Sequence, residues 1–192
     1  MGIMLLKATD HRRMPWKNGG GVTVEIAVHP QGASVDDFDW RISMATVAND
    51  GPFSLFSGID RTLSVLEGDG IVLDMAGVET VLTRESLPHF FPSDVTVSAR
   101  LIGSAITDLN VMTRRGRFTH QVRRLTVDKL FEIDVDSSPA LIFCAEGKID
   151  LTSAQNTTQL ATHDCAVLSN CAASPLQIGG NGTAYLISII SI

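Results

Sequence analysis

Residues 39–70, DWRISMATVANDGPFSLFSGIDRTLSVLEGDG, decide the fold class of this 192-residue chain. Within residues 40–47 a bulky apolar face alternates with a face that begins at Arg41, and a period of two is typical of a β-strand. The sequence NDGP at residues 49–52 predicts a turn, and a second strand is expected over residues 61–66. The stretch therefore predicts two β-strands joined through a proline-bearing turn.

The chain on both sides of this stretch continues the pattern of short strands. Further strands are expected at residues 3–6, 22–28, 71–75, 79–83, 95–101 and 107–112. The segments between them contain Gly, Pro, Ser or Asp, and no run of 12 or more residues has a convincing helical period. This spacing favours an all-β sandwich or barrel over a βαβ fold.

An internal repeat divides the chain. Residues 64–113 align with residues 142–192, and Glu67-Gly68 matches Glu146-Gly147 at an offset of 79. Duplicated β units of this length are expected to pack so that each closes a face that the other leaves open. The repeat predicts two units, residues 1–115 and 116–192, with the N-terminal strand able to cross to the second. The arginine-rich residues 114–124 are interpreted as a solvated linker, and a phosphate or nucleic-acid site is the alternative.

Composition narrows the class of protein. The net charge of −6 argues against nucleic acid as a partner, and no apolar run is long enough to span a bilayer. Three cysteines without a CxxC pair fit a reducing compartment, so a cytoplasmic location without a secretory signal is expected. The apolar residues 185–192 either complete the second unit or pair with another copy in a homodimer.

Several short motifs follow one another in order between residues 16 and 115. They are Trp16 with Asn18-Gly19-Gly20-Gly21, Thr23 and Glu25; Trp40-Arg41 with Ser43 and Ala45; Gly51-Pro52-Phe53-Ser54 with Phe56, Gly58 and Arg61; Leu66-Glu67-Gly68; and DLNVMTRR at 108–115. With the repeated order of strand, EG turn and strand, this set resembles the HutD/Ves family of the cupin superfamily. The resemblance implies an all-β bicupin of two RmlC-like antiparallel sandwich or barrel units, and a link to histidine utilisation in bacteria.

The pattern of a metal-binding cupin is missing. Such a protein presents two histidines one residue apart on a strand, followed by a carboxylate and a third histidine. Residues 53–57, FSLFS, contain no histidine, and the five histidines of the chain are remote from one another. No metal and no cofactor are therefore expected.

A polar set in the first half predicts a small-molecule pocket. Its members lie on strands or glycine loops whose other residues are apolar, and a pocket is typically lined in this way. They are Asn18, Thr23, Glu25, Arg41, Ser43, Arg61 and Asn110, with Trp16 and Gly19 beside them. Inward arginines suit a carboxylate, because a guanidinium binds both of its oxygens. The alternative is an internal ion pair of Arg41 or Arg61 with Glu25 or Glu67.

Two functions follow from this set. The first is metal-free binding of a small acidic metabolite in the first unit, with a second unit that is mainly structural. The family resemblance implies an intermediate of histidine degradation, such as urocanate or an N-formimino or N-formyl derivative of glutamate, and a regulatory role. The second function is a cofactor-free isomerase, lyase or hydrolase of a small carboxylated substrate, with Glu25 as general base.

Overall fold

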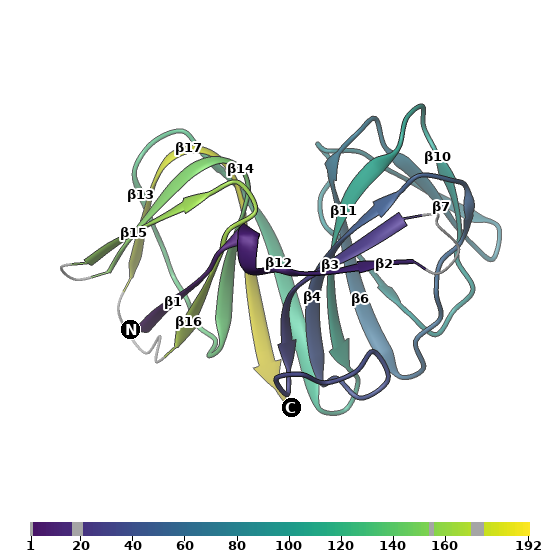
Figure 1. The fold of residues 1–192 in the computed structure, drawn as a ribbon, viewed down its shortest axis with the longest axis horizontal. Helices are drawn as coiled ribbons and strands as arrows, with labels where there is room; N and C mark the ends of the chain where they lie inside the picture. Colours follow the sequence, from purple (N-terminus) through teal and green to yellow (C-terminus); the bar gives the residue numbers. More distant parts are fainter. Residues whose placement is uncertain (1, 17–20, 154–155, 170–174) are drawn as a thin grey trace. The chain divides into compact units, whose positions relative to one another are not determined.

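The computed structural model describes residues 2–16, 21–153, 156–169 and 175–192 (Figure 1). These residues form an all-β structure, as predicted, and their one helical turn is the short 3-10 helix η1 (Ala8–Asp10). None of the described helices is long and apolar enough to cross a membrane. The strands are β1 (Gly2–Leu6), β2 (Arg12–Pro15), β3 (Gly21–His29), β4 (Trp40–Val47), β5 (Gly51–Pro52), β6 (Ile59–Glu67), β7 (Ile71–Met75), β8 (Val78–Leu82), β9 (His89–Pro92), β10 (Ser98–Leu101), β11 (Ile106–Arg114), β12 (Phe118–Val127), β13 (Phe131–Ile133), β14 (Ala140–Ser153), β15 (Asn156–Ala161), β16 (Cys165–Ser169) and β17 (Leu176–Ser191).

The chain divides into two compact units. The first contains Arg12–Thr119 with Ile192, and the second contains the residues up to His11 with His120–Ser191. The predicted bounds, 1–115 and 116–192, differ from this division at the N-terminus. There β1 pairs with β16 from Gly2 opposite Ser169 to Leu6 opposite Cys165, so the first strand belongs to the second unit.

The first unit is a sandwich of two antiparallel sheets. The six-stranded sheet has the order β2-β3-β4-β11-β6-β9, and the four-stranded sheet has the order β5-β10-β7-β8. Leu63 and Val65 of the first sheet share a buried cluster with Ile71 and Leu73 of the second. Apolar side chains on one face of each sheet therefore form the core of this unit.

The second unit is a seven-stranded sheet around an apolar core. Its main order is β1-β16-β14-β17-β12, while β13 pairs with β17 and β15 with β14. Since β17 lies between β14 and β12, the apolar residues near the C-terminus complete this sheet. Ile142, Leu151, Ile178 and Leu186 belong to the buried core cluster of this unit.

Two features of the second half differ from the sequence prediction. Gly68 and Gly147 of the matched EG pairs both have positive φ, at 90° and 86°, but β14 continues past Gly147 after a register shift between Cys144 and Glu146. The first copy instead ends β6 at Glu67. The expected linker 114–124 is also partly a strand, because β12 begins at Phe118 and lies beside β17.

Candidate functional site

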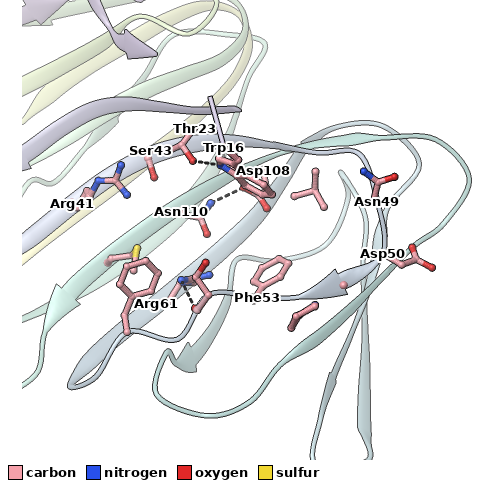
Figure 2. Close-up of a pocket in the computed structure, with 17 residues that line it drawn as sticks. Trp16, Thr23, Arg41, Ser43, Asn49, Asp50, Phe53, Arg61, Asp108 and Asn110 are labelled. Atoms are coloured by element: carbon pink, nitrogen blue, oxygen red, sulfur yellow. Dashed lines mark hydrogen bonds between the residues drawn. The ribbon is translucent and has the colours of Figure 1, made fainter. Parts of the chain in front are cut away.

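A cavity of about 640 Å³ opens in the first unit over the face of the six-stranded sheet that carries Arg41 and Arg61 (Figure 2). The face of β4 that begins at Arg41 lines it, as the alternation in the sequence predicts. The segment after β4 forms another wall. The lining residues are Trp16, Thr23, Arg41, Ser43, Ala45, Val47, Asn49, Asp50, Gly51, Pro52, Phe53, Ser54, Phe56, Arg61, Asp108, Asn110 and Met112.

The register of three neighbouring strands brings the polar residues of the floor together. Arg41 of β4 and Arg61 of β6 both lie opposite Met112 of the intervening β11. In the next row of the same face, Ser43 lies opposite Asn110. Asp108 lies two residues before Asn110 on β11 and opposite Ala45 of β4. Its side chain therefore points to the same face of the sheet.

Arg41 is held by an internal ion pair. Its Nε donates to Glu25 Oε2 at 2.8 Å, and the two side chains are only 6% and 11% exposed. Of the pairings that the sequence left open, the structure forms this one. Glu25 does not belong to the cavity lining, and it serves as the counter-ion of Arg41.

Arg61 has a different environment. The residue is 6% exposed, and it makes no ion pair with any carboxylate in the described part of the chain. Its Nη2 donates to the Ser54 carbonyl oxygen at 3.4 Å, and its Nε has no hydrogen-bond partner. The rings of Phe53, Phe56 and Phe91 surround the guanidinium with centroids 5.2–5.7 Å from its central carbon.

The pKa of Arg61 reflects this setting. Burial is the largest influence and lowers the pKa to about 10, while Asp108 raises it and Arg41 lowers it further. A buried cation in contact with aromatic rings but without a carboxylate has donors available for an anion. Arg61 is therefore the candidate anion-binding group of the cavity.

Asp108 is a buried carboxyl that the sequence analysis did not select. It accepts a 2.6 Å hydrogen bond from Nδ2 of Asn110, whose own Oδ1 has no partner. Burial is the largest influence on Asp108 and raises its pKa to about 7, against the opposing effects of Arg61 and Asn110. Its position two residues before Asn110, on the same strand face, is the signal that could have identified it.

Trp16 and Thr23 close one side of the cavity. The indole Nε1 of Trp16 donates to Thr23 Oγ1 at 2.8 Å. A Cβ at Gly21 would lie 2.2 Å from the Thr46 carbonyl oxygen and 3.0 Å from the Trp16 ring, so this position requires glycine. The other predicted members of this loop, Asn18 and Gly19, lie outside the described residues.

Metal ligands are not clustered in the described part of the chain. No group of three or more His, Cys, Asp or Glu side chains there could hold an ion. At the segment where a metal-binding cupin would carry histidines, Phe53 and Phe56 face Arg61 instead. The cavity therefore offers a cation, amide and hydroxyl groups, and aromatic rings to a ligand.

The fold defines a cupin-like protein. It is similar to YlbA of E. coli, with a TM-score of 0.70 at 11% identity over 99% of this chain and 90% of that one. Vicilin of Capsicum annuum gives 0.64 at 8% identity over 97% and 85% of the two chains. At such low identity these likenesses concern the fold alone. That each unit is a separate cupin stays a prediction.

Sequence comparison gives the family. The model of the HutD family matches residues 8–186, and the chain belongs to that family. It is 36% identical over 167 residues, 85% of each chain, to an uncharacterized 21.2 kDa protein of Pseudomonas putida named for the hutC 3′ region. Protein Ves of Citrobacter koseri is 41% identical over 118 residues, which cover 59% of this chain and 61% of that protein.

Solved structures of similar sequence agree. HutD from Pseudomonas fluorescens SBW25 has 30% identity and a TM-score of 0.84 over the whole of both chains. A conserved protein of unknown function from Pseudomonas aeruginosa PAO1 has 31% identity and a TM-score of 0.92, also over both whole chains. The predicted family is thus confirmed.

Proposed function

We propose that this chain binds a small carboxylated metabolite in the cavity of its first unit, with the carboxylate held by Arg61. The observation that carries the proposal is the buried guanidinium of Arg61, which has no carboxylate partner and an Nε without any hydrogen bond. Burial of a charge without a counter-ion is unfavourable, and a ligand carboxylate would supply the missing partner. The cavity volume of about 640 Å³ suits a small molecule.

Asn110 adds a requirement for the ligand. Its Nδ2 is already used on Asp108, which leaves Oδ1 as a buried acceptor without a partner. A ligand that donates an N–H to this oxygen satisfies it, and leaving a buried acceptor unsatisfied costs about 1–3 kcal/mol. The proposed ligand is therefore an acid that also carries an N–H donor.

Family membership narrows the candidates. Urocanate and the N-formimino and N-formyl derivatives of glutamate are intermediates of histidine degradation, and each has a carboxylate and can present an N–H. We propose a ligand from this class and a regulatory role in the cytoplasm. Formation of a homodimer stays a prediction.

The ion pair of Glu25 favours binding over catalysis. An enzyme of the predicted kind would need Glu25 as a general base within reach of a substrate proton. Its carboxylate is instead bound to Arg41 at 2.8 Å and does not belong to the cavity lining. We therefore give Glu25 a structural role in orienting Arg41.

Titration calorimetry with urocanate, N-formylglutamate and N-formiminoglutamate tests the proposal. At least one acid is expected to bind, and Arg61→Met should weaken it by about 30-fold or more, since losing a buried charged partner costs about 2–5 kcal/mol. Arg100→Met is the matched control, because Arg100 is 59% exposed and outside the cavity lining. Failure of all three acids to bind, or unchanged affinity in Arg61→Met, would contradict the proposal.

A further inference from the structure

Asp108 and Arg61 are a buried carboxyl group and a buried guanidinium that line the same cavity without forming a direct ion pair. Asp108 lies opposite Ala45 of β4 and Val65 of β6, so its immediate cross-strand neighbours are apolar. It is 1% exposed, and the side chain of Asn110 is the one side chain in the described residues that hydrogen-bonds to it. Figure 2 shows Asp108 beside Asn110, with Arg61 on the neighbouring strand β6 of the same floor.

The charged groups around Asp108 are few. Arg61 faces it from β6, Arg41 lies on β4 with its counter-ion Glu25 on β3, and Asp50 lies in the segment after β4. Since Arg41 is already paired with Glu25, Arg61 is the cation whose charge stabilises an ionised Asp108. An anionic ligand bound at Arg61 would compete with Asp108 for that same charge.

We propose that Asp108 takes up one proton when an anionic ligand binds at Arg61, so that the cavity binds the anion and a proton together. The neutral carboxyl then donates its O–H toward the ligand or Asn110 instead of repelling a second negative charge. This inference rests on the proposed function, and it adds that Asp108 takes up one proton together with the ligand.

The physical reason is the repulsion between two carboxylates near a single guanidinium in a site that excludes water. Two such groups rarely stay ionised together, because the nearby like charge raises the pKa of one of them. Burial has already raised the pKa of Asp108 to about 7 without a ligand. Protonation of this carboxylate near neutral pH therefore requires little free energy. Binding of an anion should raise that pKa further.

The sign of the pH effect follows. Below the pKa of the unliganded chain, Asp108 is already neutral, and affinity should not depend on its titration. Above that pKa each binding event must draw a proton from the solution, so affinity should fall by up to about ten-fold per pH unit. The fall should begin near pH 7, where the unliganded Asp108 titrates.

Calorimetry of the whole chain with N-formylglutamate tests this inference. Its carboxyls titrate near pH 4, well below the range of interest. Titrations at pH 7.5 in HEPES and in Tris, which differ in ionisation enthalpy, should report uptake of about 0.5–0.8 proton per ligand, since an Asp108 with a pKa of about 7 is already partly protonated at this pH. Asp108→Asn keeps the shape of the side chain without the charge, and it should bind with no proton uptake and with constant affinity from pH 6 to 9. Asp128→Asn, an exposed carboxyl of the second unit, should behave as the wild type.

The outcomes separate the two proposals. Binding that is lost in Arg61→Met but whose heat is the same in both buffers overturns the role of Asp108 and leaves the proposed function standing. Proton uptake that persists in Asp108→Asn also overturns it. Absence of any binding to the wild type removes the proposed function and this inference together. Should the Asn variant not fold, the buffer dependence and pH profile of the wild type decide.

Discussion

We expect Arg61 to make the first unit less stable than an apolar residue at this position would, because its guanidinium is buried and its Nε has no hydrogen-bond partner. A charged side chain in a dry interior is retained at the expense of stability, and apolar replacements of buried ionic groups often stabilise proteins by about 1–4 kcal/mol. The surroundings of the Arg61 guanidinium are three phenylalanine rings and one carbonyl oxygen, which suit a methionine side chain equally well. If the proposed function is right, Arg61 is retained for binding at the expense of stability.

Arg61→Met should raise the free energy of unfolding by about 1–3 kcal/mol while it removes ligand binding. Urea denaturation of the ligand-free protein measures this change. Arg41→Met should have the opposite effect, since it leaves the buried carboxylate of Glu25 without its partner. A destabilised Arg61→Met variant would mean that Arg61 is a structural residue.

Glu25 and Arg41 are expected to behave as one unit in stability. Glu25→Leu should cost about 3–5 kcal/mol, because it leaves a buried guanidinium without a counter-ion. In the double variant Glu25→Leu with Arg41→Met, both charges are absent, and most of that loss should be recovered. Thermal or urea unfolding of the single and double variants gives the coupling energy. Additive losses would show that the ion pair is not the reason for the loss.

Asp108 should give the unfolding free energy a pH dependence of definite sign. Its pKa in the folded chain is about 7, above its ordinary value of 3.8. The folded chain holds this proton more tightly, so the contribution is fully present below about pH 4 and is lost as the pH rises through 7. Between pH 5 and pH 8 the wild type should lose about 2–3 kcal/mol relative to Asp108→Asn. Parallel pH profiles of the two proteins in urea unfolding would contradict this expectation.

At the residue scale, sequence reasoning found the polar face but not its pairings. The alternation along residues 40–47 placed Arg41 and Ser43 on the cavity side, where the structure has them. The choice between Arg41 and Arg61 as partner of Glu25 depends on strand register, and the sequence pattern does not specify register. Asp108 was overlooked for the same reason, since only pairing places it in the row beside Asn110.

At the element scale, strands with clean alternation were predicted well. The expected strands at 40–47 and 71–75 have these bounds in β4 and β7. The arginine-rich segment was predicted as a linker, and the boundary between the two units does lie within it, between Thr119 and His120, but strand β12 was missed because its pattern is interrupted. From Phe118 to Arg124 the even-numbered residues of β12 are more buried than their neighbours. At the end of the strand the more buried residues are instead the odd-numbered Leu125 and Val127. This change of phase hides the period of two.

Gly21→Ala tests the junction of β3 and β4. The added Cβ would overlap the backbone oxygen of Thr46 at 2.2 Å, and backbone cannot move aside as a flexible side chain can. The two strands must separate where Gly21 pairs with Val47, and Trp16 must move from the cavity wall. We expect a loss of about 1–3 kcal/mol in unfolding free energy together with weaker ligand binding.

Gly51→Ala is the matched control for stability. Gly51 also lies in a strand of the first unit, but an added Cβ there meets nothing within 4 Å. Its unfolding free energy should change by less than about 0.5 kcal/mol. Equal losses in the two variants would attribute the effect to glycine replacement in general instead of close approach at Gly21.

At the scale of the whole molecule, each unit has an apolar core, and the lined cavity belongs to the first unit. The first unit contains the lined cavity, while buried aliphatic residues such as Ile142 and Ile178 fill the second. The second unit therefore has the composition of a supporting element. Its two described cysteines, Cys144 and Cys165, are both buried and free.

These cysteines report on the folding of the second unit. Burial is the largest influence on both thiols, and it raises the pKa of Cys144 to about 12 and that of Cys165 as well. Iodoacetamide reacts with the thiolate, so neither residue should be alkylated at pH 8 in the folded protein. Both should react once urea unfolds the chain. Peptide mapping by mass spectrometry distinguishes them from Cys171, and modification of Cys144 or Cys165 before unfolding would contradict the expectation.

The pairing of β1 with β16 has a consequence for synthesis on the ribosome. Gly2 pairs with Ser169, 167 positions later, and Lys7 and the Ala8 amide bind Asp164. At about 5–20 residues per second, the first strand waits on the order of 10–30 s for its neighbour to emerge. Residues 12–119 of the first unit are translated within that interval. The nascent chain thus carries Ile3 and Leu5 without their final neighbours after residues 12–119 have been translated, and we expect a chaperone to bind this segment.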